Sequence, residues 1–475
     1  PIQRIVCVFD DKVVPVMFGP VKADKYTMGH RFLTSALIEV NNFSEYKKSL
    51  EVGHVLLDPK ERFSRIKFDA EILADKEGLS MVDDASLMEE VAGLVEWPVV
   101  LLGSIDKEFM VVPPEVLKTT IRKNQKYFTL KTSNGKLASK FIVVANKQTP
   151  DGGASIIRGN ERVLRARLAD AKFFWEQDHR ETLVSRTPQL KRIVFHSKLG
   201  TLEDKAKRVE VLALKLAGSS PADRKMVQSA SRLAKADLTT GMVSEFPELQ
   251  GIMGGYFAEA QGFDKEISLA VSEHYLPIGM DSSIPKKPYS IALSISDKLD
   301  SLVGFFGINL KPTSSKDPYA IRRMAISLVR LIVENNNTLK LRDLINYSCM
   351  LYKDQSFEFD SKLLQKDLSE FILERLKNYL KEKQIRHDII ESSKNISNVD
   401  EILKIFKKSV ALNKNIKRDF VQNVIAIYKR SSNILYSEKE SLSEILGSAD
   451  PGLFKNDFEK NLYKKINDIR KYFSS

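Results

Sequence analysis

A chain of 475 residues is longer than a single compact core usually allows, and this length predicts about three domains. Hydrophobic residues make up 43% of the chain and charged residues 29%, as in ordinary globular proteins, and the longest apolar stretches are too short to cross a bilayer. The formal net charge of +12 favours an anionic partner, with nucleic acid ahead of a membrane surface. Because the chain starts without a secretory signal, we expect a cytoplasmic location.

Residues that carry most enzyme chemistry are sparse. The two cysteines, Cys7 and Cys349, lie far apart without metal-ligand spacing, so we expect two buried, reduced thiols. None of the six histidines pairs with a cysteine or a second histidine at ligand spacing. The chain also lacks the G-x-x-x-x-G-K-[ST], G-x-G-x-x-G and H-E-x-x-H motifs. These observations argue against a self-contained ATPase.

Residues 1–150 combine strand and helix signals and predict a mixed α/β domain. IVCVF at 5–9 and KVVPVMF at 12–18 flank the Asp10-Asp11 turn. Two apolar runs separated by a tight turn are typical of a β-hairpin, so we expect one here.

A helix and a second hairpin are predicted later in the same domain. PPEVLKTTIRKNQ at 113–125 begins with prolines, which suit the first turn of a helix because the missing amide has no partner there. YFTLKT at 127–132 and KLASKFIVVAN at 136–146 flank Asn134-Gly135. This dipeptide favours the positive φ angles of a type I′ turn. We therefore expect a sheet with helices packed on it.

From residue 151 to about 310 the pattern becomes helical. Thr201 followed by Asp204 approximates a capping box, and Pro247 opens a further helix at PELQGIMGGYFA. The segment 291–307 is apolar enough to be an interior helix. The sequence therefore predicts a second, all-helical domain.

The most basic helix expected in this domain is RGNERVLRARLADAKFFWEQD, residues 158–178, with Asn160 as its N-cap. Its packing stripe consists of Leu164, Leu168, Ala171 and Trp175. Its arginines are Arg158, Arg162, Arg165 and Arg167, of which the first three share one face. A planar guanidinium can bond two phosphate oxygens at once, so we expect these side chains to hold backbone phosphates or a subunit interface. The alternative is an exposed face bridged to Glu161, Asp170 and Glu176.

The C-terminal part predicts long helices, because only two glycines and three prolines follow Gly307. Residues 311–475 contain 31 Lys and Arg against 22 Asp and Glu, which leaves +9 of the total charge of +12 in this part. Contact with a polyanion is expected there, although a solvated helical surface would give the same composition.

Four residues of the predicted helical domain suggest a metal site. His196, Asp237, Asp297 and Asp300 could converge in space, as the ligands of His- and Asp-based metal-dependent phosphohydrolases do.

Several long segments, read in order, resemble the β subunit of bacterial glycyl-tRNA synthetases. They are GHRF (29–32), LVEWPVVL (94–101), VPPEVLKTTIRKNQKYF (112–128), RGNERVLRARLADAKFFWEQD (158–178), KLGTLEDKAKRV (198–209), AKADLTTGMVSEFPELQGIMGGYFA (234–258), EHYLP (273–277), SDKLDSLVGFFGI (296–308) and PTSSKDPYAIRRMA (312–325). The likeness covers nearly the whole chain and rests on long runs. Family chains continue at both ends, so the resemblance also implies a fragment.

The resemblance implies a multidomain α+β architecture with four parts. Residues 1–150 would be a B3/B4-like mixed α/β domain, as in the β subunit of the phenylalanyl enzyme, and residues 151–310 an all-α HD-like domain. Residues 311–400 would form a helical linker region. Residues 401–475 would be part of a DALR-type anticodon-binding domain, into which AIYKRSSNIL at 426–435 fits.

The resemblance also bears on the metal hypothesis. A working HD site needs a His-Asp dipeptide, and this chain has Ala236-Asp237 at that place. We therefore prefer a degenerate, metal-free HD scaffold, with His196, Asp237 and Asp297 at its former ligand positions, because open metal sites need their full set of ligands. Asp237, Asp297 and Asp300 are then expected to cap helices or to pair with Lys235 and Lys298.

The function that the resemblance implies is that of the tRNA-binding β subunit of a glycine–tRNA ligase. The chain would bind and orient tRNA(Gly), while a separate α subunit, in an α2β2 heterotetramer, would activate glycine with ATP and Mg²⁺. This chain would itself hold no cofactor and no catalytic residue. Two alternatives stay open: an HD-type metal-dependent phosphohydrolase and a noncatalytic structural assembly subunit.

Further candidate contacts to tRNA are basic residues outside the arginine-rich helix. They are Lys123, Lys126, Arg322, Arg323, Lys429 and Arg430, with Asn433 able to contact a base edge. Tyr127 beside Lys126 suits a stacking surface but equally a strand that enters a core. The Arg322-Arg323 pair has the alternative of being held by local carboxylates.

Overall fold

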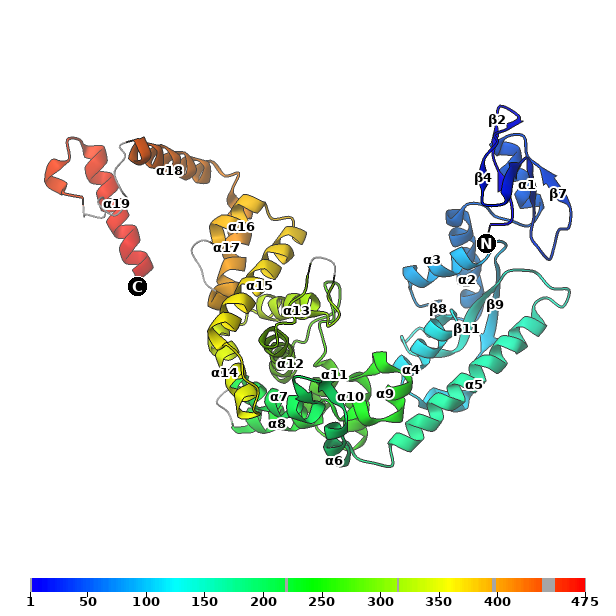
Figure 1. The fold of residues 1–475 in the computed structure, drawn as a ribbon, viewed down its shortest axis with the longest axis horizontal. Helices are drawn as coiled ribbons and strands as arrows, with labels where there is room; N and C mark the ends of the chain where they lie inside the picture. The colour runs from blue at the N-terminus through cyan, green and yellow to red at the C-terminus, as the bar shows by residue number, and fades with distance from the viewer. Residues whose placement is uncertain (1, 218–220, 314–315, 395–398, 438–448, 475) are drawn as a thin grey trace. The chain divides into compact units, whose positions relative to one another are not determined.

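The structure, a computed structural model, describes residues 2–217, 221–313, 316–394, 399–437 and 449–474. These residues are mostly helical, with small sheets in the N-terminal part (Figure 1). The chain forms two compact units, residues 1–375 and residues 376–475. Each unit is described by itself below.

The first residues build three small sheets. Their strands are β1 (Ile5–Val6), β5 (Val21–Asp24) and β4 (Met17–Phe18) in one sheet, β2 (Val8–Phe9) with β3 (Lys12–Val13) in the second, and β6 (Tyr26–Met28) with β7 (Leu37–Glu39) in the third. Asp10 and Asp11 connect β2 to β3 with φ angles of 51° and 59°. The predicted hairpin around these two residues is confirmed, with strands shorter than the apolar runs that indicated it.

A four-stranded antiparallel sheet in the order β8-β10-β11-β9 follows, after helix α1 (Phe43–Val52). Its strands are β8 (Ser80–Met81), β10 (Phe128–Lys131), β11 (Leu137–Ala145) and β9 (Val99–Ser104). Side chains alternate along β11: Ile142 packs with Ile66 of α2 (Pro59–Lys76) and Leu87 of α3 (Ala85–Leu94), whereas Phe141 packs with Leu164 of the opposite layer. The sheet therefore carries helices, as predicted, and the structure places them on both of its faces.

The turn between β10 and β11 differs from the predicted type. The amide of Gly135 donates to the carbonyl of Thr132 at 2.9 Å, and of the Asn134-Gly135 pair only Gly135 has a positive φ, 78°. A type I′ turn needs positive φ at both central residues, so that prediction is wrong. The hairpin instead uses a turn followed by a glycine in the left-handed conformation. This arrangement still pairs β10 with β11, but its loop is one residue longer than that of a type I′ hairpin.

The prolines at 113–114 start a helix, as predicted. It is α4 (Pro114–Thr119), and it continues into a π-helical turn, η2 (Thr120–Asn124). The short 3-10 helix η1 (Lys107–Val111) precedes it.

Helix α5 (Ala154–Asp178) carries the arginine-rich segment and begins earlier than predicted. Its N-cap is Gly153, at φ 91°, and the Asp151 carboxylate accepts the amide of Ser155 at 2.7 Å. Asn160, the predicted N-cap, lies in the second turn, where its Nδ2 donates to the Ile156 carbonyl at 2.7 Å. The prediction was wrong because Asp151, whose carboxylate accepts an amide of the first turn, and Gly153 at the N-cap provide a start signal upstream of residue 158.

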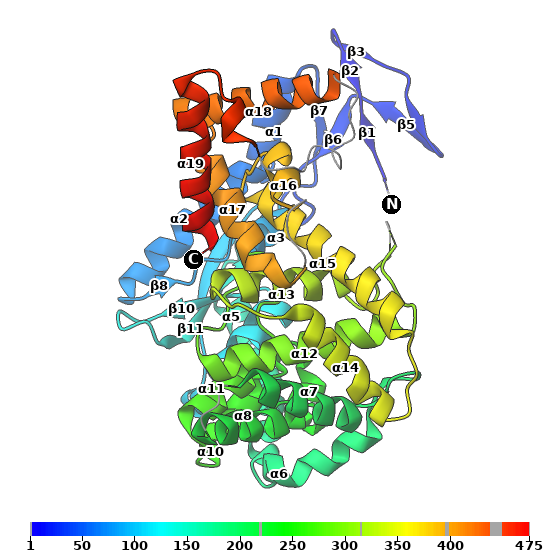
Figure 2. The ribbon, with the colours of Figure 1, turned by 90° about the vertical axis from the view of Figure 1, so that its left-hand side faces the viewer.

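The helical part of the first unit is built around α12 (Pro288–Gly307), which is buried along nearly its whole length. It packs on α7 (Leu202–Leu216), α8 (Pro221–Leu233) and α11 (Lys265–Glu273), and Figure 2 shows these helices lying side by side. The prediction of an interior helix at 291–307 is therefore confirmed.

Two further helix starts were predicted in this part. The capping box of α7 is present, with the Asp204 amide donating to Thr201 Oγ1 at 3.2 Å and the Thr201 amide donating to Asp204 Oδ2 at 2.8 Å. The helix expected from Pro247 is interrupted. A 3-10 turn, η5 (Pro247–Leu249), ends before Gly251 at φ 82°, and α10 (Ile252–Ala260) starts after it.

Short elements complete the first unit. They are α6 (Leu183–Arg186), η3 (Thr187–Arg192), the hairpin of β12 (Val194–His196) and β13 (Gly200–Thr201), η4 (Ala236–Thr239) and α9 (Gly241–Glu245). One apolar core extends from Leu101 of β9 through Leu164 of α5 to Leu293 of α12. Sheet and helical part thus share buried contacts.

The C-terminal part contains helices and no strands in its described residues, as predicted. Its elements are α13 (Ile321–Glu334), α14 (Leu341–Asp354), α15 (Ser361–Glu382), α16 (His387–Lys394), η6 (Val399–Glu401), α17 (Ile402–Asn415), α18 (Asp419–Ser437), η7 (Pro451–Leu453) and α19 (Asp457–Ser474). Within the described ranges, no helix combines the length and apolarity that crossing a membrane requires. The boundaries 1–150, 151–310, 311–400 and 401–475 and their domain names stay predictions.

Both cysteines carry free thiols. Cys349 is buried, as expected, but Cys7 is only half-buried because it lies in the small N-terminal sheets, which provide little cover.

Candidate nucleic-acid interface

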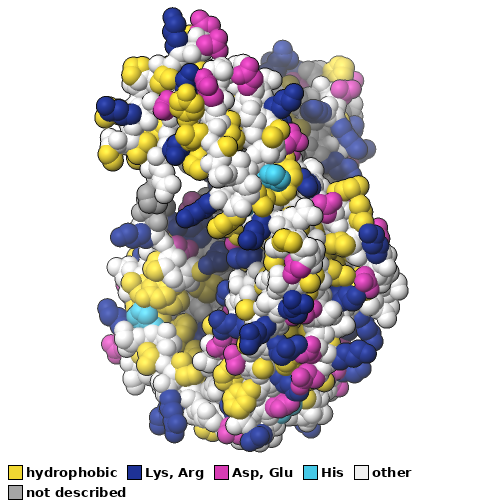
Figure 3. All heavy atoms as spheres, turned by 90° about the vertical axis from the view of Figure 1, so that its right-hand side faces the viewer, with side chains coloured by type: hydrophobic (Ala, Val, Ile, Leu, Met, Phe, Trp, Pro, Cys, Tyr) yellow, Lys and Arg dark blue, Asp and Glu magenta, His cyan; other side chains and the backbone are white. Residues whose placement is uncertain are grey.

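Four arginines project from the exposed surface of α5, and we call them the arginine row. By helical spacing, Arg158, Arg162 and Arg165 share one face and Arg167 lies on another. Arg158, Arg162, Arg165 and Arg167 are all exposed, whereas Leu164, Leu168 and Ala171 on the other side of the helix are buried. Trp175 of the predicted packing stripe is half-buried. The face of the molecule drawn in Figure 3 carries many Lys and Arg side chains in its lower half, with Asp and Glu side chains among them. A buried stripe fixes the helix, so the arginines project from a rigid support.

Only one arginine of this row has a carboxylate partner within the described residues. Arg165 Nε donates to Asp106 Oδ2 at 2.6 Å, and this hydrogen bond lowers the pKa of Asp106 and raises that of Arg165. The expected partners on the same helix, Glu161, Asp170 and Glu176, form no ion pair with these arginines within the described residues. Glu161, for example, accepts the amide of Ser104 at 2.8 Å. The remaining guanidinium groups, at Arg158, Arg162 and Arg167, are therefore available to an external anion.

The candidates next to β10 are tied to the protein itself. Lys123 pairs with Glu248 at 2.9 Å and Lys126 with Glu90 at 2.7 Å. Tyr127 is buried, its ring stacks on that of Phe141 with centroids 4.9 Å apart, and burial raises its pKa to about 12. Of the two interpretations of Tyr127, the strand entering a core is confirmed.

At the start of α13, the Asp317 carboxylate binds backbone amides. It accepts from the amides of Ile321 at 2.8 Å and Arg322 at 3.0 Å, so it caps the helix and does not hold either guanidinium. The Arg322 guanidinium donates to the Thr313 carbonyl. Arg323 is exposed, and its side chain has no partner in the described part of the chain. The alternative that local carboxylates hold these two side chains is therefore wrong for the described residues.

In the second unit, Lys429, Arg430 and Asn433 all lie on α18 and are exposed. Tyr428 beside them is 72% exposed. Two cations, an aromatic ring and an amide on one exposed helix are the groups that single-stranded RNA contacts commonly use.

The three residues that the resemblance places at former HD ligand positions, His196, Asp237 and Asp297, do not converge on a vacant centre. His196 lies at the end of β12, where its Nδ1 accepts the Lys198 amide at 3.1 Å and its ring lies against Phe305 and Tyr319. Asp237 in η4 is fully buried, and its Oδ2 accepts the amides of Gly251 at 2.5 Å and Gly254 at 3.1 Å. Asp237 therefore caps α10, as expected, and burial raises its pKa to about 6.

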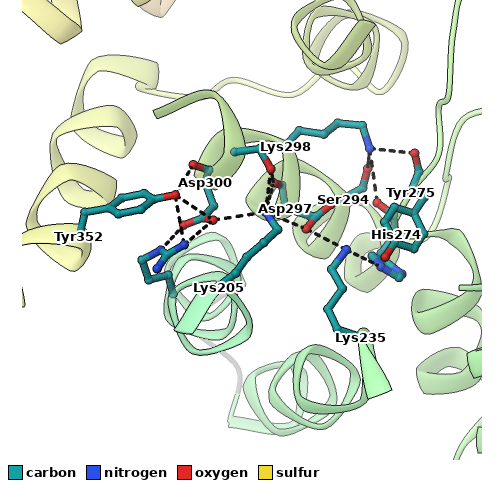
Figure 4. Close-up of polar contacts among 11 residues, drawn as sticks. Lys205, Lys235, His274, Tyr275, Ser294, Asp297, Lys298, Asp300 and Tyr352 are labelled. Carbon is teal, nitrogen blue, oxygen red and sulfur yellow. Dashed lines mark hydrogen bonds and ion pairs between the residues drawn. The ribbon is translucent and has the colours of Figure 1, made fainter. Parts of the chain in front are cut away.

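Asp297 is surrounded by ammonium groups. Together with Lys205, Lys235 and Lys298 it forms what we call the lysine cluster (Figure 4). Its Oδ1 lies 2.9 Å from Lys235 Nζ and 3.2 Å from Lys205 Nζ. Burial alone would raise the pKa of Asp297, but the two ammonium groups outweigh it and hold that pKa well below its usual range. The expected pairing of Asp297 with Lys235 is confirmed.

Lys298 has a different role from the expected one. Its Nζ donates to the carbonyl oxygens of Tyr275 at 3.1 Å and Leu276 at 2.9 Å and to Ser294 Oγ at 2.9 Å, so it holds the chain that follows α11 (Figure 4). Burial lowers the pKa of Lys298 to about 7 and that of Lys235 to about 8.

Asp300 is fully buried and binds partners other than those predicted from the sequence. It accepts from Arg208 Nε at 2.7 Å, from Lys205 Nζ at 3.2 Å and from the hydroxyl of Tyr352 at 3.3 Å. The expected pairing with Lys235 or Lys298 is therefore wrong for Asp300. Lys205 and Arg208 are three residues apart on α7, as Asp297 and Asp300 are on α12, and this matched spacing was the available sequence signal.

The side chains predicted as possible metal ligands, His196, Asp237, Asp297 and Asp300, do not fit a metal-dependent phosphohydrolase. Within the described ranges, no three His, Cys, Asp or Glu side chains are placed to hold a metal ion together. The carboxylates of Asp297 and Asp300 already face ammonium and guanidinium groups, which would repel a divalent cation.

Comparison with known proteins identifies the class first: the chain is related to subunits of aminoacyl-tRNA synthetases. A family described as "Glycyl-tRNA synthetase beta subunit" matches residues 1–395. Because this match covers most of the chain, the chain belongs to the glycyl-tRNA synthetase beta subunit family, and the resemblance inferred from the sequence is confirmed.

Individual relatives agree with this assignment. The glycine–tRNA ligase beta subunit of Rhodospirillum centenum is 44% identical over 441 residues, covering 92% of this chain and 61% of the relative. The beta subunits of Cereibacter sphaeroides and Ruegeria sp. are each 39% identical, covering 98% of this chain and 68% of the relative. This chain thus spans between three fifths and about two thirds of the length of these proteins.

Proposed function

We propose that this chain binds and orients tRNA(Gly) for ATP- and Mg²⁺-dependent glycylation on a separate α subunit, in a cytoplasmic α2β2 assembly. The observation that carries the proposal is the arginine row of α5, in which Arg158, Arg162 and Arg167 are exposed on a rigid helix without carboxylate partners among the described residues. The names of the relatives support the enzyme class. Positioning one substrate against another can supply a large part of a rate enhancement, so such a subunit can raise the rate without catalytic groups of its own.

A division of labour along the chain follows from this proposal. The row on α5 would grip backbone phosphates, because arginine binds phosphate oxygens through paired donors without reading sequence. Lys429, Arg430 and Asn433 of α18, in the DALR-like region, would contact the anticodon arm. The HD-like region would serve as a scaffold whose former ligand positions are filled by the lysine cluster.

The test replaces Arg158, Arg162 and Arg167 together by glutamate and measures the affinity for a tRNA(Gly) transcript over a range of salt concentrations. If the three side chains contact phosphates, the slope of log affinity against log salt should become shallower by about 2 to 3. The matched control reverses three exposed lysines of α14 and α15, Lys353, Lys362 and Lys366, which changes the net charge by the same amount.

The proposal fails if the arginine variant keeps the affinity and the salt dependence of the unchanged chain. Equal losses in the two variants would also contradict it, because they would report net charge and not a contact surface. Loss of α-subunit assembly with unchanged tRNA affinity would assign the row to a subunit interface.

A further inference from the structure

A cavity of about 450 Å³ opens beside the lysine cluster. Its wall includes Lys235 and Asp297 of the cluster, Tyr275 after α11, Phe195 of β12, and Tyr319 and Arg323 at the start of α13. All these residues belong to the first unit. The tRNA-binding proposal does not use this cavity.

Positive charge exceeds negative charge around this cavity. Four buried cations, Lys205, Lys235, Lys298 and Arg208, face three buried carboxylates, Asp237, Asp297 and Asp300. Arg323 adds a further positive charge at the cavity, whereas Glu248, which also lines it, is neutralised by Lys123 at 2.9 Å. A buried excess of cations is costly, and burial together with the neighbouring cations lowers the pKa of Lys235 and of Lys298. A bound anion would offset this cost, so the surroundings favour an anionic ligand.

Hydrogen-bond donors on the cavity wall are available to such a ligand. Within the described residues, the guanidinium of Arg323 and the hydroxyls of Tyr275 and Tyr319 have no protein partner. Lys235 Nζ lies 3.8 Å from the centroid of the Tyr275 ring, so a ligand group bound by the Tyr275 side chain would lie close to the lysine cluster. Guanidinium and hydroxyl donors on the wall of one cavity that also exposes buried cations suit phosphate oxygens.

Aromatic rings line the same cavity. Phe195 and Tyr319 both contribute to the wall, and the Tyr319 ring is stacked on Phe305 with centroids 4.5 Å apart and an interplanar angle of 21°. A ring fixed by stacking can accept a further flat group on an open face or edge at little entropic cost. The cavity volume lies in the range of ordinary small-molecule sites, about 300 to 1,000 Å³.

We propose that this cavity binds a nucleotide, with its phosphate at Arg323 beside the lysine cluster and its base against the aromatic wall. A free nucleoside monophosphate and an unpaired nucleotide at the end of an RNA strand share this chemistry. The site is a binding site only, and its existence does not depend on tRNA being held at α5.

Proton uptake should accompany binding. The pKa of Lys235 is about 8 and that of Lys298 about 7, so both are partly deprotonated just above neutrality. The groups that face Lys235 are Asp297, His274, Tyr275, Lys205 and Asp237. A nearby phosphate would raise the pKa of both lysines, and affinity should therefore fall as pH rises from about 7 to 9.

The test is calorimetric titration of the whole chain with adenosine 5′-monophosphate, inorganic phosphate, adenosine and a single-stranded RNA trinucleotide. The nucleotide should bind more tightly than phosphate or adenosine alone. Replacing Arg323 by alanine should weaken nucleotide binding about tenfold, the usual worth of a charge-assisted hydrogen bond. Arg192→Ala is the matched control, because Arg192 is an exposed arginine outside the cavity wall.

A second variant, Lys235→Met, should reduce the dependence of affinity on pH between about 7 and 9, where the phosphate of a nucleotide stays doubly charged. If the trinucleotide binds more tightly than the mononucleotide, and Arg323→Ala removes this difference, the ligand is the end of an RNA strand. If the mononucleotide binds more tightly, the ligand is a free nucleotide. Absence of nucleotide binding, or equal affinity in the Arg323→Ala and Arg192→Ala variants, overturns the proposal.

Discussion

Asp300 shows how single residues hold the centre of the first unit. Its side chain is inaccessible to solvent and accepts hydrogen bonds from Arg208, Lys205 and Tyr352. The guanidinium of Arg208 also lies on the Tyr352 ring, 3.8 Å from its centroid. Such a network is stable only when every member has its partner, because a charge left alone in the interior is poorly compensated.

Replacing Asp300 by asparagine keeps the shape but leaves Arg208 without a buried counter-charge and Lys205 with Asp297 alone. We expect a loss of about 3 to 5 kcal/mol in the free energy of unfolding, measured by urea denaturation. Asp106→Asn is the control, since the pair of Asp106 and Arg165 is solvent-exposed and should contribute little. Equal shifts in the two variants would contradict the description of the buried network.

At the scale of elements, α12 is positioned by a close approach to α14. A Cβ atom added at Gly304 would overlap the hydroxyl of Tyr352 and come within 3.1 Å of Leu199 Cδ1. The glycine therefore lets α14 bring Tyr352 onto Asp300.

Gly304→Ala should destabilise the chain by about 1 to 3 kcal/mol, because the added methyl group forces the two helices apart. Gly159→Ala in α5 is the opposite case: nothing lies within 4 Å of its Cβ position, and alanine is the better helix former, so a gain of up to about 1 kcal/mol is expected. In thermal unfolding, the melting temperature should fall in Gly304→Ala and rise in Gly159→Ala. A stable Gly304→Ala variant would show that this packing is looser than described.

The elements that sequence reasoning predicted well are those set by local signals. The Thr201 capping box, the turn at Asp10 and Asp11 and the interior helix at 291–307 all depend on residues close together in the chain. The N-cap at Asn160 was wrong because Asp151 and Gly153, upstream of the segment considered, start the helix. The lysine cluster was only partly predicted, because Lys205 and Asp297 are 92 positions apart in the sequence, and no local pattern indicates such a contact.

For the whole molecule, the family was accessible from sequence because long segments of the chain match it, and the profile match over residues 1–395 agrees. The location of the positive charge was harder to predict. Residues 311–475 hold most of the net charge, yet the arginines best placed for phosphate lie on α5, where packing of Leu164 and Leu168 turns them outward. Net charge indicates which class of partner to expect, whereas the folded structure is needed to locate the surface that contacts it.

The measurement that tests the central claim most directly is glycylation of a tRNA(Gly) transcript by this chain alone, by a purified α subunit alone and by the two together. The account predicts that the mixture charges tRNA and that this chain alone does not. It also predicts that the Arg158, Arg162 and Arg167 variant lowers the charging rate of the mixture at limiting tRNA. Glycylation by this chain without the α subunit, or a mixture indifferent to the three arginines, would contradict it.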